Sequence, residues 1–411
     1  MTELPKQGLP WSEIEPRLIE AGLKDVKWRE GRSPAFVHYA GDDVLEVAKK
    51  AYLMYFSENG LGLRAFGSLA KFEAEVVAMG LALLHGGEGS RGAMTTGGTE
   101  SIFLAVKAAR DAAASRGIPA GGRPQIVLAY SAHPAFDKAA HFLGLETVRT
   151  PLRADYTADP RAFEAAISPR TVMVVGSAPA YPHGVVDPIP ELAALARSRG
   201  IWMHVDACVG AYFAPFARML GVQMPAFDLA VPGVVSISAD LHKYGYAAKG
   251  ASTLFFADDA SFGWMQYRFD NWPRGAYATN TLVGTRAGGA IASAWAVMNY
   301  LGVDGYLRVT DRVLATRRAL EDGVRRLGLQ VLGRPELSIL AYGSPDHDVA
   351  AIGQGLLQRG WLTGYVTNPA GIHQMLNLTH EPVVERYLAD LAASIDEAGA
   401  SRGGAAIRAV Y

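Results

Sequence analysis

Short apolar runs alternate with amphipathic helical patterns along residues 59–300, and this alternation restricts the fold more than any other feature of the chain. The apolar runs are rich in Val and Ile and favour buried strands, at residues 126–130, 171–176, 202–207, 234–238 and 252–256. Helical patterns precede or separate them, at residues 100–114, 135–143, 160–167 and 189–198. Such alternation predicts an α/β fold built on a doubly wound, mostly parallel sheet.

The chain of 411 residues suits two or three structural units. We expect an N-terminal arm over residues 1–58, with helices at 11–21 and 43–56, and a large domain over residues 59–300. A long amphipathic pattern over residues 306–327 leads into a smaller C-terminal α/β domain, residues 301–411. Residues 337–341 and 361–366 favour strands in that domain.

The charge balance excludes several classes of partner. Lys and Arg number 39 against 40 Asp and Glu, with no polybasic block, so we expect no nucleic-acid or anionic-lipid partner.

The apolar stretches end well short of the roughly 20 residues that a membrane helix needs, so no integral membrane segment is expected. The N-terminus does not resemble a signal peptide, and the single cysteine, Cys208, fits a reducing compartment. A cytoplasmic enzyme without a bound metal is the expectation.

Lys243 lies in the polar segment Ser236-Ile-Ser-Ala-Asp-Leu-His-Lys-Tyr-Gly-Tyr246, directly after a predicted strand. A lysine forms a Schiff base when its ammonium loses its proton easily, through desolvation or a neighbouring cation. If Lys243 holds an aldehyde cofactor, pyridoxal 5'-phosphate (PLP) is the leading candidate. The chain must then supply a carboxylate for the pyridine nitrogen, a cradle for the phosphate and a flat group against the ring.

Asp206 ends the predicted strand over residues 202–207 and precedes Lys243 by 37 residues. A buried carboxylate keeps the pyridine nitrogen protonated through a charge-assisted hydrogen bond. A solvated aspartate at a strand end is the alternative, and the later Lys243 favours the cofactor role.

The Gly-rich turn Thr95-Thr-Gly-Gly-Thr-Glu-Ser101 precedes a predicted helix. Its glycines allow close backbone approach, and the helix N-terminus offers N–H groups to a phosphate. Alternatively, Thr99 is simply the N-cap of that helix. The spacing matches neither the dinucleotide-binding nor the P-loop pattern.

Three further residues are candidates with open alternatives. His133 follows a strand and is placed to stack on a flat cofactor, or it caps a helix or lies on the surface. Cys208 packs as a small residue, with a place beneath the ring as the second interpretation. His242 binds the cofactor phosphate or relays protons, or only lines the turn.

As a set, these motifs resemble sphingosine-1-phosphate lyase and its bacterial relatives, within the PLP-dependent group II decarboxylase superfamily. The resemblance rests on Thr-Gly-Gly-Thr-Glu-Ser, His-Pro-Ala-Phe-Asp-Lys, His-Val-Asp-Ala-Cys and Ser-Ala-Asp-Leu-His-Lys-Tyr-Gly-Tyr-Ala-Ala-Lys-Gly, and it covers nearly the whole chain. Tyr244 stands where the amino-acid decarboxylases of the superfamily usually have Trp.

The resemblance implies a fold type I PLP enzyme, a homodimer with active sites shared between subunits. It implies Lys243 as the Schiff-base lysine, Asp206 on the pyridine nitrogen and His133 on the ring. The implied phosphate ligands are Gly98, Thr99 and His242, with Gly284 and Thr285 acting from the partner subunit. Ser238 is a further candidate cofactor contact, and Lys249 is expected at the substrate end of the pocket.

The chain departs from this family where the substrate phosphate is expected to bind. His38 stands where a Tyr is usual, Gly62 where a His is usual, and Arg64 where an Asp is usual, whereas Asn59 is kept. Either Arg64 and Lys249 restore phosphate binding, or Arg64 suits a carboxylate or a differently placed phosphate.

Three functions remain open from the sequence. The first is a carbon–carbon lyase that performs retro-aldol cleavage of a phosphorylated amino alcohol or related β-hydroxy amine, with His242, Tyr246 or Lys249 as the base. The second is an amino-acid α-decarboxylase, with Arg64 or Arg286 binding a carboxylate. The third is a PLP-fold binding protein without catalysis, which the intact Lys243 and Asp206 disfavour.

Overall fold

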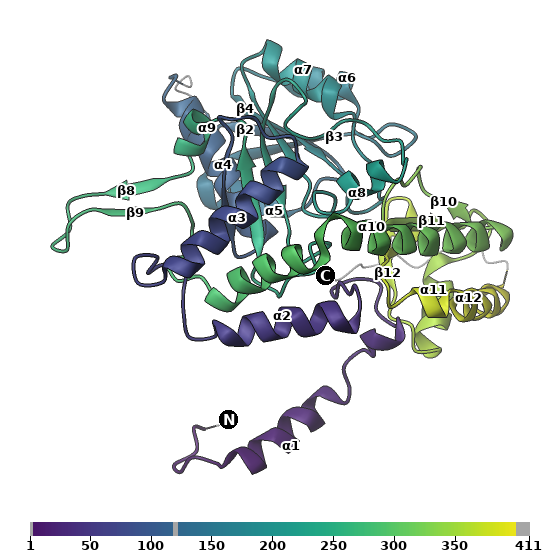
Figure 1. Cartoon of the computed structure of the whole chain (residues 1–411). Helices are drawn as coiled ribbons and strands as arrows, with labels where there is room; N and C mark the ends of the chain where they lie inside the picture. Colours follow the sequence, from purple (N-terminus) through teal and green to yellow (C-terminus); the bar gives the residue numbers. More distant parts are fainter. Residues whose placement is uncertain (1–2, 118–121, 400–411) are drawn as a thin grey trace.

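A seven-stranded sheet forms the centre of the protein in the computed structural model, which describes residues 3–117 and 122–399 (Figure 1). Its strand order is β1-β7-β6-β5-β4-β2-β3. The strands are β1 (Arg91–Thr95), β2 (Gln125–Ala129), β3 (Glu146–Thr150), β4 (Thr171–Ser177), β5 (Trp202–Asp206), β6 (Val234–Ala239) and β7 (Ser252–Phe256). Strand β7 is antiparallel to both neighbours, and β2 to β6 are parallel, which confirms the predicted mostly parallel α/β fold.

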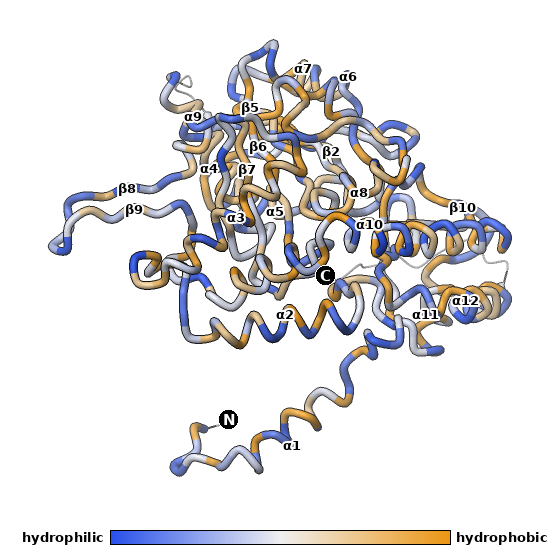
Figure 2. The backbone as a smooth tube through the Cα atoms, in the orientation of Figure 1, coloured by the Kyte–Doolittle hydropathy of each residue, from blue (hydrophilic) through white to orange (hydrophobic). Residues whose placement is uncertain are grey.

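Helices cover both faces of this sheet because successive strand residues point to opposite faces. In β2, Ile126 and Leu128 join a hydrophobic cluster with α4 (Gly98–Ala114) and α5 (Ala135–Leu143). Val127 and Ala129 join the opposite cluster with α6 (Pro160–Ala166) and α7 (Ile189–Ser198). The strands through the centre of the molecule are accordingly among its most apolar segments (Figure 2). Helices α3 (Gly67–Leu83), α8 (Ala214–Met219) and α9 (Asp259–Gly263) complete the large domain.

A long helix, α10 (Gly288–Arg326), leads from the large domain to the C-terminal part. It is two helical segments joined at Gly302, whose φ of 54° breaks the helix. The pattern predicted over residues 306–327 is the second segment. The domain boundary predicted between residues 300 and 301 lies at this kink, and it stays a prediction.

The C-terminal part contains a four-stranded antiparallel sheet in the order β10-β11-β13-β12. Its strands are β10 (Gln330–Val331), β11 (Ile339–Gly343), β12 (Gly364–Thr367) and β13 (Ala370–Met375), and its helices are η2 (Glu381–Val383), α11 (Val349–Gln358) and α12 (Val384–Ala398). Strand β13 was not predicted, because its central residues Gly371, His373 and Gln374 weaken the apolar pattern.

Two segments stand away from the body of the chain (Figure 1). Helix α1 (Trp11–Gly22) has no buried residue, whereas α2 (Asp42–Met54), beyond η1 (Trp28–Glu30), packs on α10. The hairpin of β8 (Tyr267–Phe269) and β9 (Tyr277–Thr279) projects from the large domain. Within the described ranges, none of the helices combines the length and apolarity required to cross a bilayer.

Candidate active site

A cavity of about 440 Å³ lies at the carboxyl ends of the parallel strands, where open α/β sheets bind their ligands. Segments that follow β1, β2, β4, β5 and β6 all contribute to it. It brings together seven of the predicted residues: Gly98, Thr99, His133, Asp206, Cys208, His242 and Lys243. Residues far apart in the sequence therefore form one site.

Lys243 points toward a carboxylate that the sequence did not single out. Its Nζ lies 3.0 Å from Oδ2 of Asp240, which is only 2% exposed and also accepts a hydrogen bond from Ser252 Oγ at 2.6 Å. Burial alone lowers the pKa of Lys243, but the carboxylates, Asp240 above all, reverse this effect and raise the pKa above its ordinary value. The expectation of an easily lost proton is therefore wrong for the lysine in this ion pair.

Asp206 terminates a chain of hydrogen bonds along β5 and β6. Trp202 Nε1 can only donate, and it donates to Ser236 Oγ at 2.8 Å. The Ser236 hydroxyl then donates to His204 Nδ1 (2.8 Å), His204 Nε2 to Ser238 Oγ (3.2 Å), and the Ser238 hydroxyl to Asp206 Oδ1 (3.3 Å). This order leaves the carboxylate as the final acceptor. Burial lowers the pKa of His204 to about 4, so its ring is neutral, as the chain requires.

Ser238 thus orients Asp206 and does not line the cavity itself. The backbone N–H of Cys208 also donates to Asp206 Oδ1, at 3.1 Å. Ser238 and Cys208 both donate to Oδ1 of Asp206, so Oδ2 can accept a hydrogen bond from the N–H of a pyridinium ring. His204 could have been found from the sequence, since it lies two residues before Asp206 and so on the same face of the strand.

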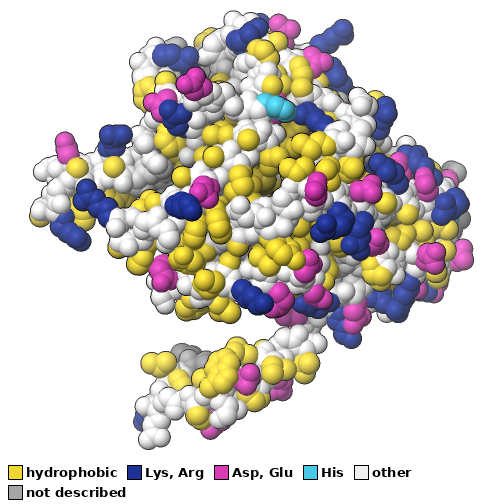
Figure 3. Space-filling view, viewed as in Figure 1, with side chains coloured by type: hydrophobic (Ala, Val, Ile, Leu, Met, Phe, Trp, Pro, Cys, Tyr) yellow, Lys and Arg dark blue, Asp and Glu magenta, His cyan; other side chains and the backbone are white. Residues whose placement is uncertain are grey.

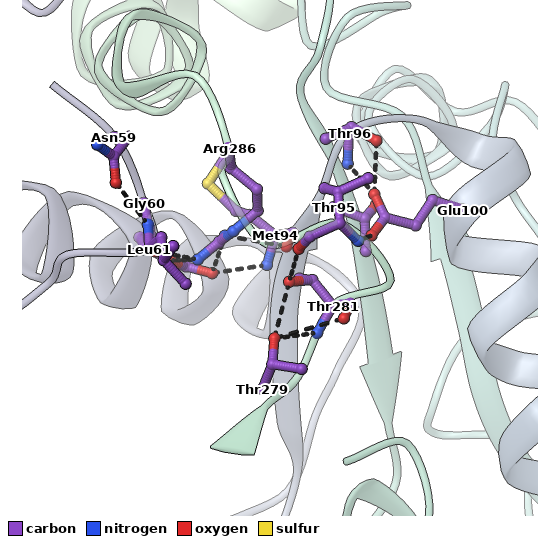
Figure 4. Close-up of polar contacts among 12 residues, drawn as sticks. Asn59, Gly60, Leu61, Met94, Thr95, Thr96, Glu100, Thr279, Thr281 and Arg286 are labelled. Carbon is purple, nitrogen blue, oxygen red and sulfur yellow. Dashed lines mark hydrogen bonds and ion pairs between the residues drawn. The ribbon is translucent and has the colours of Figure 1, made fainter. Parts of the chain in front are cut away.

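The Gly-rich turn leads directly into α4, whose first N–H groups have no partner within the helix. A Cβ at Gly98 would lie 2.8 Å from both Asp240 Oδ2 and Cys208 Sγ, so only glycine fits there. Glu100 braces the turn, because its Oε2 accepts hydrogen bonds from Thr96 N (2.7 Å) and Thr96 Oγ1 (2.5 Å) (Figure 4). The result is a rigid cradle for an anion.

Two histidines border the cavity as neutral rings. His133 Nδ1 accepts from the backbone N–H of Ala135 (3.1 Å), and burial lowers its pKa despite the nearby Asp206. His242 Nδ1 donates to the carbonyl of Ala251 at 2.8 Å, and its Nε2 lies 3.7 Å from Asp240 Oδ2. Burial lowers the pKa of His242 also, although Asp240 opposes the shift. Cys208 is buried, and burial raises the pKa of its thiol well above the ordinary value.

His38 and Lys249 lie next to this group. Lys249 Nζ donates to the carbonyl of His242 at 3.2 Å, and desolvation together with Lys243 lowers its pKa. The His38 ring packs edge-on against Tyr244, 4.8 Å between centroids, with its Nε2 3.1 Å from Met375 Sδ. Burial, and then the charges of Lys249 and Lys243, hold the pKa of His38 well below its ordinary value.

Tyr246 does not line this cavity. Its ring stacks on Tyr306 at 6.3 Å in the hydrophobic core, and its backbone φ is 58°. The buried hydroxyl has no hydrogen-bond partner among the described residues, and burial raises its pKa well above the ordinary value. The structure therefore does not support Tyr246 as the base.

Arg286 is held by other groups and is not placed to bind a substrate carboxylate. Its guanidinium forms a bidentate ion pair with Glu73, at 2.7 and 2.9 Å, and donates to the carbonyls of Met94 and Gly60 (Figure 4). The side chain is only 10% exposed, and these bonds use the donors of both terminal nitrogens, whereas the buried Nε has no partner among the described residues. Arg286 is thus a structural anchor in this chain.

The remaining predicted residues lie outside the cavity of their own chain. Asn59 Oδ1 accepts from the N–H groups of Leu61 and Gly62, both at 3.1 Å, and so closes the turn that carries the exposed Arg64. Gly284 and Thr285 lie on a partly exposed segment. Their predicted contacts require a second subunit.

The comparisons with known proteins agree with this geometry. Residues 71–332 match the pyridoxal-dependent decarboxylase conserved domain. Sphingosine-1-phosphate lyase 1 of Rattus norvegicus is 39% identical over 398 residues, 96% of this chain and 70% of the rat protein. The sphingosine-1-phosphate lyase of Oryza sativa is 38% identical over 412 residues, 98% of this chain and 76% of the rice protein.

Solved structures extend the likeness to three dimensions. The sphingosine-1-phosphate lyase of Burkholderia pseudomallei superposes with a TM-score of 0.92 at 35% identity, over 97% of this chain and 93% of that one. The glutamate decarboxylase of Lactobacillus brevis shares the fold, with a TM-score of 0.85 at 18% identity, over 98% and 96% of the two chains.

The residues present fit PLP as the cofactor. Gly98 and Thr99 line the cavity at the start of α4, Asp206 keeps an acceptor oxygen, and Lys243 provides the amine in the same cavity. From this fit and these relatives, we conclude that the chain is a PLP-dependent lyase and belongs to the sphingosine-1-phosphate lyase family.

Proposed function

We propose that this enzyme cleaves a phosphorylated amino alcohol of the sphingoid-base type into a long-chain aldehyde and phosphoethanolamine. The observation that carries the proposal is the meeting of Lys243 and Asp206 in one cavity, with Lys249 bonded to the carbonyl of His242 beside it. The relatives of this chain at 38–39% identity are named sphingosine-1-phosphate lyases. Lys243 and Asp206 serve the cofactor, and Lys249 offers a positive charge beside it.

Lys249 and His38 form the proposed phosphate end of the substrate site. Lys249 supplies charge. The Nδ1 of His38 is buried and has no hydrogen-bond partner among the described residues, and in its Nδ1–H tautomer the neutral ring can donate to a phosphate oxygen. Arg64 supplies a further cation if the turn after Asn59 meets the site of a second subunit. Together they would replace the Tyr and His that the family usually has.

A second cavity fits the hydrocarbon chain of such a substrate. Its volume is about 410 Å³, and it shares His133 and Tyr181 with the cavity around Lys243, so the two are adjacent. Most of its wall is apolar, and strand β12 closes its far side through Val366 and Thr367. We therefore place the chain beyond Cβ in this cavity.

The reaction requires a base for the β-hydroxyl proton. Lys243 would hold the cofactor before the substrate amine takes its place, and the cofactor would supply an electron sink for the Cα–Cβ bond that breaks. Loss of the hydroxyl proton turns the Cβ–O bond into the aldehyde carbonyl, and Cα then takes up a proton, so that atoms and charges balance. His242 Nε2 is the group available, since the pKa of His242 is lowered and the residue lies next to Lys243, whereas Lys249 stays charged at the phosphate end.

The decarboxylase alternative assigns a substrate carboxylate to Arg64 or Arg286. Among the described residues that line the cavity, Lys243 is the sole Lys or Arg, and Arg286 is already paired with Glu73. Retro-aldol cleavage is therefore the function that the site supports better.

We also propose a homodimer in which each subunit completes the site of the other. Helix α1 carries exposed apolar side chains, including Trp11 (62% exposed) and Ile19 (63% exposed), and yellow side chains cover much of the lower segment in Figure 3. Gly284 and Thr285 lie outside their own cavity, next to the exposed Leu282. A second copy would cover these surfaces. A cytoplasmic location remains a prediction from the single cysteine.

A substrate screen tests the proposal. Purified protein with PLP is incubated with phosphorylated amino alcohols, their unphosphorylated forms and β-hydroxy amino acids, and aldehyde release is measured. We expect release from the long-chain phosphorylated compounds above all. Carbon dioxide without aldehyde, from any amino acid, would refute the lyase assignment.

A further inference from the structure

The carboxylate of Glu100 joins two segments that belong to different active sites in the proposed dimer. We propose that Glu100 is a positioning residue that couples cofactor binding in one subunit to association with the other. The inference rests on the proposed shared-site dimer, and it assigns to Glu100 a role that its place in the Gly-rich turn does not by itself indicate.

One oxygen of Glu100 holds the phosphate cradle of its own subunit. Oε2 accepts from the backbone N–H of Thr96 at 2.7 Å and from its hydroxyl at 2.5 Å (Figure 4). Thr96 precedes Gly97 and Gly98 and lines the cavity with them. The position of the cradle therefore depends on the carboxylate.

The other oxygen holds the segment that is expected to reach the partner. Oε1 accepts from the backbone N–H groups of Leu282 (2.8 Å) and Val283 (3.3 Å). The other end of this segment is fixed by the ion pair of Arg286 with Glu73. Gly284 and Thr285 lie between these two anchors and are presented outward.

An anion at this place needs an explanation, because a carboxylate beside a phosphate cradle opposes phosphate binding. Glu100 is 6% exposed, and four N–H or O–H donors, two from each segment, compensate its burial. The carboxylate is the one side chain of this size that accepts on both of its oxygens. A side chain that joins two segments through their N–H and O–H donors needs one acceptor oxygen for each segment, and a carboxylate has both.

Substitution by glutamine tests the requirement. The amide of Glu100→Gln keeps one acceptor oxygen and turns a donor toward the other segment, so it satisfies either Thr96 or the Leu282 and Val283 pair, but not both. The matched control is Glu75→Gln. Glu75 accepts from Trp295 Nε1 at 2.5 Å and pairs with Lys71. The change of charge is therefore the same, whereas the amide oxygen of the variant still accepts from Trp295.

The measurement is the dimer dissociation constant of the full chain by analytical ultracentrifugation, with and without saturating PLP. If the two events are coupled, PLP lowers the dimer dissociation constant by the same factor by which dimerisation lowers the dissociation constant of PLP. We expect PLP to lower the dimer dissociation constant about tenfold or more in the wild type and in Glu75→Gln, which is within the usual range for coupled sites. In Glu100→Gln, we expect PLP to lower this constant less than about threefold.

The outcomes separate this inference from the dimer proposal. Full coupling in Glu100→Gln overturns the role of Glu100 and leaves the shared-site dimer standing. A monomer, or a wild-type dimer that PLP does not tighten, overturns the shared-site proposal and this inference with it. If Glu100→Gln does not fold, Thr96→Val removes a single donor at constant shape, and unchanged coupling in that variant also contradicts the inference.

Discussion

The Nζ of Lys243 lies 3.0 Å from Oδ2 of Asp240, a buried carboxylate three residues earlier in the same turn. The same carboxylate borders Gly98 in the phosphate cradle and accepts from Ser252. Asp240 therefore sets both the charge and the direction of the reactive lysine. For Lys243 to condense with an aldehyde, its extra proton must first leave this ion pair.

Replacing Asp240 by Asn should ease that loss. Without this carboxylate, only Cys208 and Asp206 oppose the effect of burial on Lys243, so its pKa falls. We expect the pH at which PLP capture is half-maximal to move down by about one unit or more. The visible absorbance of lysine-bound PLP, followed against pH after mixing, measures this shift.

Asp228→Asn is the control, since Asp228 is also buried but pairs with Arg218 away from the cavity. Its pH profile of capture should match that of the wild type. An unchanged profile in Asp240→Asn would show that the ion pair does not govern the lysine.

The hydrogen-bond chain that ends at Asp206 predicts graded losses of activity. Asp206→Asn should keep PLP bound and lower kcat by orders of magnitude, because a neutral pyridine is a poor electron sink. Ser238→Ala removes a single donor to the carboxylate, a hydrogen bond worth about 1.5–3 kcal/mol, so kcat should fall roughly tenfold to a hundredfold. If Ser238→Ala had the kcat of the wild type at full PLP content, the hydrogen bond from Ser238 to Asp206 would not contribute to catalysis.

Narrowing the second cavity should select against long substrates. Thr367→Trp fills it from β12, away from Lys243, so kcat/KM for a long-chain substrate should drop at least about tenfold relative to a short-chain analogue. Gln330→Trp, an exposed position on β10 of the same small sheet, serves as the control. If kcat/KM fell equally for the long-chain and the short-chain substrate, the hydrocarbon chain would have to bind outside this cavity.

Buried histidines predict a loss of stability in acid. Burial lowers the pKa of His183, His204 and His373 to about 4. Between pH 6.5 and 4 the unfolded chain binds protons on these rings that the native protein does not, so the free energy of unfolding decreases as the pH falls. Asp187 and Glu336, with pKa values raised by burial to about 6 and about 7, act in the opposite direction.

The variant His183→Phe isolates one of these contributions, because the ring stacks on Tyr156 at 4.6 Å and Phe keeps that packing. Relative to the wild type, its free energy of unfolding should rise by on the order of 1–3 kcal/mol between pH 6.5 and pH 4. Denaturant titrations at several pH values measure it. A constant difference across this range would mean that His183 is not buried as a neutral ring.

The fold was predictable because its signals are local. Strands such as β4 are apolar throughout, and the helices between them have clear faces, so the parallel sheet followed from the pattern. Lys243 and Asp206 were identifiable because Asp206 ends β5 and Lys243 lies in the turn after β6, and parallel strands bring their carboxyl ends to one edge. The Gly302 kink escaped prediction because its sequence carries a weaker signal. So did the strands that are short or carry polar residues, namely β1, β3, β8, β9, β10 and β13.

The supporting residues could not be predicted, because their roles come from partners distant in the sequence. Glu100 meets Leu282 across 182 positions, and Arg286 meets Glu73 across 213. A carboxylate or guanidinium has no periodic signal that tells an anchor from a ligand. Arg286 was accordingly predicted to bind substrate, whereas in the structure Glu73 holds it.

The central claim is that Lys243 carries a PLP-dependent retro-aldol cleavage. The most direct measurement is the yield of the two products from a long-chain amino alcohol phosphate, with wild-type protein and with Lys243→Ala at equal protein and PLP concentrations. The account predicts aldehyde and phosphoethanolamine in equal amounts from the wild type, and neither product above background from Lys243→Ala. Substantial aldehyde from Lys243→Ala, or substrate consumption by the wild type without aldehyde, would contradict it.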